Sequence, residues 1–226
     1  MADMESFREA VTAWAAVDAG DLDGARAADD AGDTGDARDA GDAARELAAR
    51  LSVRTAVLLE GRSDAEAVDA LAARRGRDLA AEGVCVLPMG GAMSVGRYAR
   101  LLGPTGLGLR LTGLCDEAER GYYSRGFERA GAAGQGFFIC AADLEDELIR
   151  ALGVPRVEDL VRAEGDLRPL RSFLRQPAQR DRDPQQRLRR FLGTKKGRKI
   201  RYGRVLVEAL DPGRVPTPLE GLLAGL

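Results

Sequence analysis

Residues 55–64 read Thr-Ala-Val-Leu-Leu-Glu-Gly-Arg-Ser-Asp, and this stretch decides the fold. Thr55–Leu59 is a short apolar run of the kind found in strands that are buried on both faces. Glu60 follows the run directly, and Gly61 lets the chain turn tightly into the next element. Asp64 would then lie in the first turn of a helix, close to Glu60. The pattern therefore predicts a strand, a tight turn and a helix.

The same alternation continues toward the C-terminus. The expected strands are Thr55–Leu59, Val84–Leu87, Leu109–Cys115 and Phe137–Cys140, and the expected helices are Ala65–Arg75, Ser94–Leu102, Glu117–Ala130 and Leu144–Leu152. Ser63 is expected to cap the first of these helices, with Glu66 completing a capping box. Strands that alternate with helices across short connections predict an α/β fold, with a mainly parallel, Rossmann-like four-stranded sheet flanked by helices.

Four regions are expected along the chain. Residues 1–18 form an amphipathic helix, residues 19–41 an acidic low-complexity linker, residues 42–153 the α/β core, and residues 154–226 a basic, mostly helical extension that completes the domain. The first helix carries apolar residues at steps of three and four, from Met4 to Val17, and is expected to dock on the core. After the linker, which is rich in Ala, Asp and Gly, a helix is expected to resume at Asp42.

Composition excludes several chemistries. The 226 residues include no histidine, which rules out Ser–His and Cys–His catalysis and histidine-ligated zinc. No apolar run is long enough to span a bilayer, and the N-terminal residues do not resemble a secretory signal. Three cysteines in apolar runs indicate buried thiols in a reducing compartment, so a cytoplasmic protein is expected.

Charge is distributed unevenly along the chain. Residues 168–204 hold fourteen lysines and arginines against two aspartates, whereas residues 1–50 hold five arginines against thirteen acidic residues. A basic stretch of this density is typical of a polyanion contact, so nucleic acid is the expected partner. The residues expected to bind nucleic acid are Arg189, Arg190, Lys195, Lys196, Arg198, Lys199 and Arg201.

Acidic side chains follow three of the four expected strands. Ligands bind beyond the carboxyl ends of the strands in an open parallel sheet. Carboxylates gathered there repel one another, and a hard dication such as Mg²⁺ or Mn²⁺ relieves that repulsion. The candidate metal ligands are Glu60, Asp64, Asp116, Glu119, Asp143 and Glu145.

Lysine is rare in this chain. Only three of the 34 basic residues are lysines, and all three (Lys195, Lys196 and Lys199) lie within Gly193–Ile200 of the basic stretch. The use of lysine instead of arginine here suggests a requirement for a compact positive charge, such as one that contacts a phosphate.

Taken in order, Glu-Gly-Arg-Ser-Asp at 60–64, the acidic cluster from Asp116 and Asp-Leu-Glu at 143–145 resemble the Toprim domain. The closest variety resembles the catalytic domain of OLD-family (overcoming lysogenization defect) nucleases, in which a helical region carries a lysine like those of Thr194-Lys195-Lys196-Gly197-Arg198. The resemblance spans roughly residues 52–205.

The resemblance implies a Toprim fold and a metal-dependent nuclease that hydrolyses phosphodiester bonds, with DNA favoured over RNA. It implies that Glu60, Asp64 and Asp116 are catalytic and hold one or two Mg²⁺ or Mn²⁺ ions together with Asp143 or Glu145. Lys195 or Lys196 would stabilise the charged transition state.

Two departures from the Toprim pattern leave alternatives open. Toprim proteins usually carry Asp-x-Asp after the third strand, but here the second position is Ala118, with Glu117 or Glu119 as substitutes. OLD nucleases carry an ATPase domain, whereas this sequence has no Gly-x-x-x-x-Gly-Lys-Ser/Thr loop, so ATP dependence would require a separate partner chain. A non-catalytic Toprim protein that binds nucleic acid or a partner is therefore an alternative. A nucleotidyl transferase is a further one, and the apolar N-terminal helix also allows a homodimer.

Overall fold

The computed structural model describes residues 2–23 and 33–226, and the side chains of residues 3–18 and 38–226. The strands are β1 (Thr55–Leu59), β2 (Val84–Pro88), β3 (Arg110–Asp116) and β4 (Phe138–Cys140). The helices are α1 (Ala2–Asp23), α2 (Asp33–Arg50), α3 (Arg62–Arg74), α4 (Val95–Leu102), α5 (Arg120–Arg129), α6 (Leu144–Leu152), α7 (Val154–Ala163), α8 (Leu167–Leu174), α9 (Pro184–Gly193), α10 (Lys196–Glu208) and α11 (Thr217–Ala224). Short 3₁₀ turns are η1 (Ala92–Ser94), η2 (Glu117–Glu119), η3 (Pro177–Gln179) and η4 (Pro212–Arg214). Among the described helices, none combines the length and the apolar character needed to cross a bilayer.

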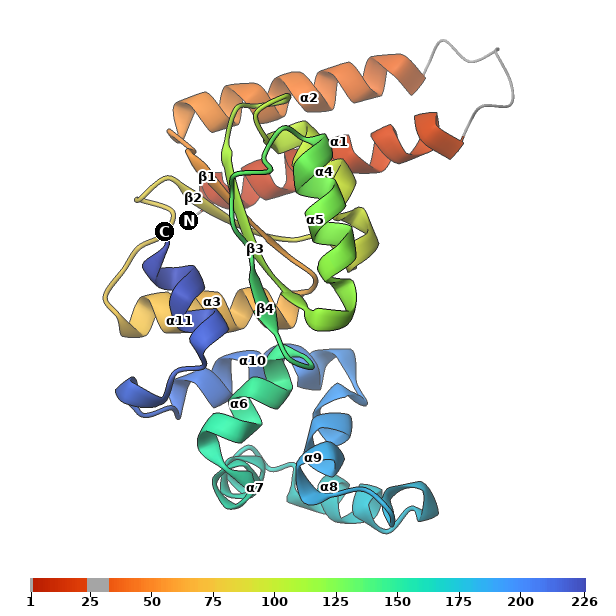
Figure 1. Ribbon diagram of the computed structural model, residues 1–226, viewed down its shortest axis with the longest axis vertical. Coiled ribbons are helices and arrows are strands. Elements are labelled where there is room, and N and C mark those ends of the chain that lie inside the picture. The colour runs from red at the N-terminus through yellow and green to blue at the C-terminus, as the bar shows by residue number, and fades with distance from the viewer. Residues whose placement is uncertain (1, 24–32) are drawn as a thin grey trace.

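The sheet is fully parallel, with strand order β2-β1-β3-β4 (Figure 1). Thr55 in the central strand β1 pairs with Val84 of β2 and with Arg110 of β3, and Asp116 at the end of β3 pairs with Cys140 of β4. The predicted α/β fold and all four predicted strands are confirmed, with boundaries that differ by one residue at most. Parallel pairing brings the carboxyl ends of the four strands to one edge.

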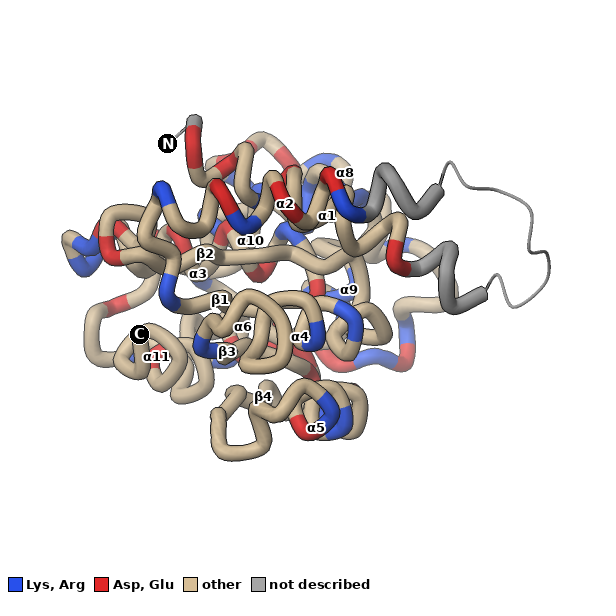
Figure 2. Tube along the Cα trace, turned by 90° about the horizontal axis from the view of Figure 1, so that it is seen from above, with Lys and Arg blue, Asp and Glu red and all other residues tan. Residues whose placement is uncertain are grey.

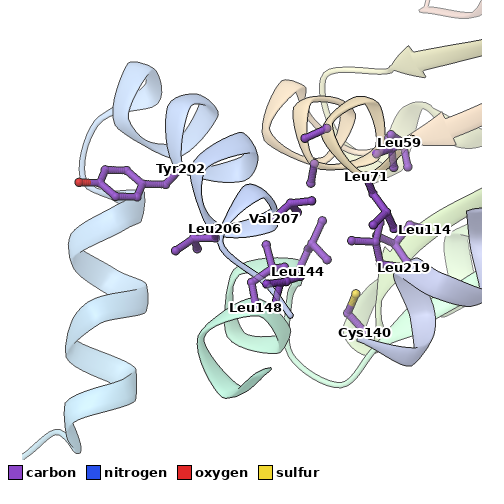
Figure 3. Packing of buried hydrophobic residues seen from close by; sticks show 14 of the residues in the cluster. Leu59, Leu71, Leu114, Cys140, Leu144, Leu148, Tyr202, Leu206, Val207 and Leu219 are labelled. Atoms are coloured by element: carbon purple, nitrogen blue, oxygen red, sulfur yellow. The ribbon is translucent and has the colours of Figure 1, made fainter. Parts of the chain in front are cut away.

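Both faces of the sheet are buried by helices. One cluster joins Val57 and Leu59 of β1 to α3, α6, α10 and α11 (Figure 3), and the other joins Ala56 and Leu58 to α1, α2, α4 and α5. Alternate side chains of a strand point to opposite faces, so a strand covered on both sides must be apolar throughout. β1 meets this condition, since all five of its residues are buried.

Helix α10 packs closely against α3, which carries the acidic turn after β1. A Cβ at Gly203 would lie only 2.3 Å from the backbone oxygen of Ser63, so the two backbones approach to a distance that only glycine allows. Arg204 pairs with Glu66 at 2.9 Å beside this contact. Arg74 at the end of α3 donates hydrogen bonds to the backbone carbonyls at the C-terminal end of α10 and just beyond it. The chain segment 196–208 is thereby held against α3.

The N-terminal helix docks on the core, as predicted. Met4, Phe7 and Val11 are buried between α1 and the sheet, so this apolar face is not available to a second copy. The helix that was expected to resume at Asp42 begins at Asp33 instead, because alanines and arginines outweigh the two glycines of α2. The predicted linker is therefore shorter than residues 19–41, and its central part, residues 24–32, lies outside the described residues.

Candidate metal centre and basic surface

Three carboxylates from two strand ends meet at the carboxyl edge of the sheet. One oxygen each of Glu60, Asp116 and Glu119 lies within 4.8 Å of the others. Glu60 follows β1, Asp116 ends β3, and Glu119 ends the 3₁₀ turn η2 that continues from β3. The adjacency of β1 and β3 in the sheet brings these sequence-distant residues together.

Asp64 lies beside this trio but is committed to the start of α3. Its Oδ2 accepts a hydrogen bond of 3.0 Å from the backbone N–H of Gly61, which is the N-cap of the helix. The expected capping box on Ser63 and Glu66 is therefore wrong, since the helix starts two residues earlier than that pattern required. Ser63 is buried against α10 instead, and the Glu66 side chain binds Arg204.

Asp143 and Glu145 are each paired with a cation of the chain. Asp143 caps α6 by accepting from the N–H of Asp146 at 2.8 Å, and its other oxygen accepts from Arg189 Nε at 2.5 Å. Glu145 is buried, with an oxygen 3.4 Å from Lys199 Nζ. We call the trio, Asp64 and these two paired carboxylates the acidic ring; two of its six members, Asp143 and Glu145, are already paired with cations.

Burial and crowding raise the pKa values of Asp64, Asp116 and Glu119. Burial, followed by the charges of Asp143, Glu60, Glu119 and Glu145, raises the pKa of Asp116 to about 7. Burial, followed by the hydrogen bond and the charge of Glu60, raises the pKa of Glu119 to about 7. Burial, followed by the charge of Glu145, also raises the pKa of Asp64 to about 7. Raised pKa values mean that the negative charges of the cluster are not balanced, and a bound cation would balance them.

The trio fits a divalent cation. Glu119 Oε2 is buried and has no hydrogen-bond partner among the described residues, although a buried carboxylate oxygen normally has one. All three donors are carboxylate oxygens, which suit the hard cations Mg²⁺ and Mn²⁺. Glu60, Asp116 and Glu119 are therefore the residues that would hold such an ion, with Asp64 adjacent.

Lys199 is the lysine that reaches the acidic ring. It lies one helical turn before Gly203, on the face of α10 that packs toward α3. Burial lowers the pKa of its ammonium, but the charges of Glu145 and Asp64 outweigh this and leave the pKa above its ordinary value. Lys195 and Lys196, which were expected to be catalytic, are exposed at the start of α10. The sequence grouped Lys199 with the other two lysines and with the nucleic-acid surface, but only Lys195 or Lys196 was expected to be catalytic.

Two hollows flank Lys199. One of about 490 Å³ is lined by Asp143, Glu145, Arg189 and Arg190 together with Arg182 of the preceding loop. The other, of about 440 Å³, lies beside Glu60 and is bordered by Arg62, Gly90, Gly91 and Lys196. Both hollows combine cations with open access to the acidic ring, which suits a phosphate-bearing chain that passes over Lys199.

The basic surface is smaller than the sequence suggested. Arg198 is buried, where it donates to Thr194 Oγ1 at 2.7 Å, pairs with Asp166 at 3.3 Å and stacks on the Phe191 ring, so its expected contact with nucleic acid is wrong. Arg201 is held by Asp166 and by Glu164. Acidic and basic positions are intermixed along the trace, which explains this extensive pairing (Figure 2).

Some cations remain unpaired among the described residues. Arg190, Lys195 and Lys196 are exposed and form no ion pair there. Arg168 and Arg171 of α8, and Arg175 directly after it, are also exposed and unpaired among the described residues, and they line a hollow of about 670 Å³. These three arginines were not among the predicted nucleic-acid contacts, although their spacing of three and four residues indicates a common helix face.

A family model matches the part of the chain that carries much of this site. Residues 53–117, which contain Glu60, Asp64 and Asp116, match the family model described as "Overcoming lysogenization defect protein-like, TOPRIM domain". No curated protein sequence gives a significant match.

Solved structures share the fold. The C-terminal region of the Xanthomonas campestris pv. campestris OLD protein has 24% identity and a TM-score of 0.57, over 76% of this chain and 93% of that one. The C-terminal region of the Burkholderia pseudomallei OLD protein has 21% identity and the same TM-score, over 76% of this chain and 96% of that one. The chain thus carries a Toprim domain that resembles the Toprim domain of OLD proteins.

Proposed function

We propose that this chain is a divalent-metal-dependent nuclease that hydrolyses phosphodiester bonds, with DNA as its substrate. The observation that carries the proposal is the convergence of Glu60, Asp116 and Glu119 at the carboxyl edge of the sheet, with Lys199 paired to the neighbouring Glu145. The OLD-like Toprim match covers the first part of that site.

The reaction needs water activation and charge stabilisation. Hydrolysis joins a water oxygen to phosphorus and breaks the bond to one ester oxygen, which then takes up a proton. When bound, Mg²⁺ or Mn²⁺ supplies Lewis-acid chemistry of the kind that makes water a nucleophile at neutral pH.

The chain's own residues would hold the metal ion and orient its ligands. Glu60, Asp116 and Glu119 provide the oxygen donors, and Asp64 fixes the turn that aims Glu60 by binding the N–H of Gly61. Lys199 Nζ places a positive charge beside the acidic ring, where it can stabilise the additional negative charge on the phosphoryl oxygens in the transition state. Arg190, Lys195 and Lys196 are exposed cations for the flanking phosphates.

The ion pairs of Asp143 and Glu145 favour a single metal ion. Arg189 and Lys199 already neutralise the two carboxylates that would complete a second cation site. Ala118, at the position where Toprim proteins usually have a second aspartate, is exposed and offers no ligand. The same features favour the second candidate, a Toprim protein that binds nucleic acid without cutting it.

Cleavage of supercoiled plasmid tests the proposal. The protein is incubated in Mg²⁺, Mn²⁺, Ca²⁺ or EDTA beside Glu60→Gln and Asp116→Asn. Glu117→Gln is the matched control, because Glu117 belongs to the same acidic run but is exposed and bound to Arg120 at 3.6 Å. Nicking that requires Mg²⁺ or Mn²⁺ and survives only in the wild type and the control supports a nuclease. Plasmid binding without nicking under all conditions would overturn it and leave the binding protein.

An intracellular location and a separate ATPase partner remain predictions. The three cysteines are buried and form no disulfide, which is the state that a reducing compartment maintains.

A further inference from the structure

Two large apolar side chains are exposed at the edge of the sheet that holds the acidic ring. Among the described residues, Met93 with 80% and Tyr122 with 42% of their surface accessible are the exposed large hydrophobic side chains. Met93 belongs to η1, which follows β2, and Tyr122 belongs to the first turn of α5, which follows β3 and η2. Both therefore lie beyond the carboxyl ends of strands.

A close glycine contact joins α4 and α5, the helices at whose starts the two residues lie. A Cβ at Gly126 would lie 3.1 Å from the Cα of Gly96, so α4 and α5 touch backbone to backbone (Figure 1). Tyr122 lies one helical turn before Gly126 on the same helix face, and Met93 lies three residues before Gly96. Since both helices start at the carboxyl edge of the sheet, both side chains lie on the catalytic side of this contact.

A cation accompanies the aromatic ring. The Arg125 guanidinium lies 5.3 Å from the centre of the Tyr122 ring and forms no ion pair among the described residues. The remaining tyrosines of the chain are buried. The surface thus combines an aromatic face, a flexible thioether and a free cation, just after the acidic segment that ends in Glu119.

We propose that Met93, Tyr122 and Arg125 form a seat for an unpaired nucleobase, and that the substrate is single-stranded or locally unpaired at this point. The inference rests on the proposed function and specifies its substrate. A base stacks on an aromatic side chain only when its face is free, and in a duplex the neighbouring bases cover both faces. Arg125 supplies the charge for the adjacent phosphate, and the position beside the acidic ring is where the strand must pass.

Binding of a defined strand in Ca²⁺ tests the seat. The probe is a 12-nucleotide DNA with one 5-iodouracil, offered single-stranded or annealed to its complement, to full-length wild type, Tyr122→Ala, Tyr122→Phe and Met93→Ala. Ser124→Ala is the control, because Ser124 is the exposed neighbour on α5. Loss of one base–aromatic stack should weaken single-strand binding on the order of tenfold in Tyr122→Ala. Tyr122→Phe and the control should bind as wild type does, and duplex binding should be unchanged throughout.

Photo-crosslinking supplies the second readout. Irradiation of the wild-type complex should attach the iodouracil to the peptide that contains Tyr122. Equal affinity of wild type and Tyr122→Ala for the single strand, absence of single-strand binding by wild type, or a crosslink elsewhere would overturn the seat. So would a dimer that Tyr122→Ala and Met93→Ala dissociate without any change in strand affinity.

The two proposals fail separately. If the wild-type protein crosslinks through Tyr122 but never nicks plasmid, the nucleobase seat is supported and the nuclease proposal is refuted. If the protein nicks plasmid but binds the single strand equally well without Tyr122, the nuclease proposal is supported and the nucleobase seat is refuted.

Discussion

Gly203 of α10 lies directly against the backbone of Ser63 in α3: a Cβ at position 203 would fall 2.3 Å from the Ser63 oxygen. The contact matters because Lys199 is one helical turn away on α10, and Asp64 directly follows Ser63. The spacing between the two helices therefore sets how far the ammonium lies from the acidic ring.

Replacing Gly203 by alanine should push α10 away from α3. A backbone clash cannot be relieved by a change of rotamer, so the free energy of unfolding is expected to fall by about 2 kcal/mol. Gly197→Ala is the matched control on the same helix, because a Cβ there meets no atom within 4 Å. It should be neutral or stabilising by up to about 1 kcal/mol. Urea unfolding followed by circular dichroism measures both, and equal stability of the two variants would contradict the argument.

Removing the Lys199 ammonium should reduce cleavage far more than substrate binding. Loss of one preorganised charge at a transition state costs on the order of a hundredfold in kcat. Lys195→Ala and Lys196→Ala should raise KM with little effect on kcat, since both side chains are exposed. Steady-state cleavage kinetics separate these effects, and a larger fall of kcat in Lys195→Ala or Lys196→Ala than in Lys199→Ala would reverse the assignment.

Stability must be separated from catalysis in that experiment. Lys199→Ala leaves the buried Glu145 carboxylate without its partner, which destabilises the protein. The double variant Lys199→Met/Glu145→Gln removes both charges and should regain the thermal stability of the wild type while remaining inactive. Activity in the stable double variant would show that the lysine acts through the fold.

Glu119→Gln should weaken Mn²⁺ binding, and Glu117→Gln should not. Changes even to outer-shell partners of a metal cost roughly 10- to 100-fold in affinity, and a direct ligand should cost at least as much. Titration by electron paramagnetic resonance measures the affinity, and the wild type is expected to bind one ion per chain because Asp143 and Glu145 are occupied by cations. Two equivalent ions, or equal affinities of the two variants, would contradict this arrangement.

The ion-free protein should lose stability as the pH rises from about 5 to about 8. Asp64, Asp116 and Glu119 have pKa values of about 7 in the folded chain. Their values are near 4 when unfolded, so only the folded state binds these protons between the two values. The free energy of unfolding therefore decreases as the pH rises through that window.

Mn²⁺ should reverse this trend. It competes with the protons, so its stabilisation should be large at pH 8 and small at pH 5.5, with a rise in Tm of roughly 5 to 10 °C when the ion exceeds its Kd a hundredfold. Differential scanning fluorimetry in EDTA and in Mn²⁺ at both pH values provides the measurement. Glu119→Gln should show a weaker pH dependence in EDTA. A higher Tm at pH 8 than at pH 5.5 without metal would refute the assignment of these pKa values.

The sheet and the trio could be predicted from the sequence because they depend on local patterns. Strands buried on both faces are apolar throughout, and residues that follow parallel strands must meet at one edge. Glu60 and Asp116 were therefore predictable from their positions alone. The match of those positions to an ordered family pattern strengthened the prediction.

Which lysine lies beside the acidic ring could not be predicted, because this depends on packing between helices. Lys195, Lys196 and Lys199 lie within one turn and a half of each other, and only the contact of Gly203 with Ser63 selects the face that turns toward the acids. Arg198 did leave a signal: with Tyr202 and Leu206 it forms a stripe of residues four apart, which is the buried face of α10. A count of the charges in a basic stretch does not reveal such a stripe.

The unpaired arginines of α8 should contribute to nucleic-acid binding outside the acidic ring. Each phosphate contact releases counterions and adds about 0.9 to the slope of log K against log salt for a duplex, and about 0.7 for a single strand. Replacing Arg168, Arg171 and Arg175 by alanine should therefore lower the slope by roughly two units and weaken binding at low salt. Cleavage at saturating substrate should remain unchanged, since these residues do not border the acidic ring.

The matched control for α8 is the alanine triple of Arg38, Arg45 and Arg50 on α2. These arginines are also exposed, but α2 and α8 lie at opposite ends of the molecule (Figure 1). Two of them are already bound to acids, Arg45 to Asp42 at 2.7 Å and Arg50 to Asp3 at 3.8 Å. Both triple variants change the net charge equally, so a general effect of charge would shift their salt slopes by the same amount. Fluorescence anisotropy at several salt concentrations distinguishes the cases, and only a fall confined to the α8 variant shows that nucleic acid reaches this surface.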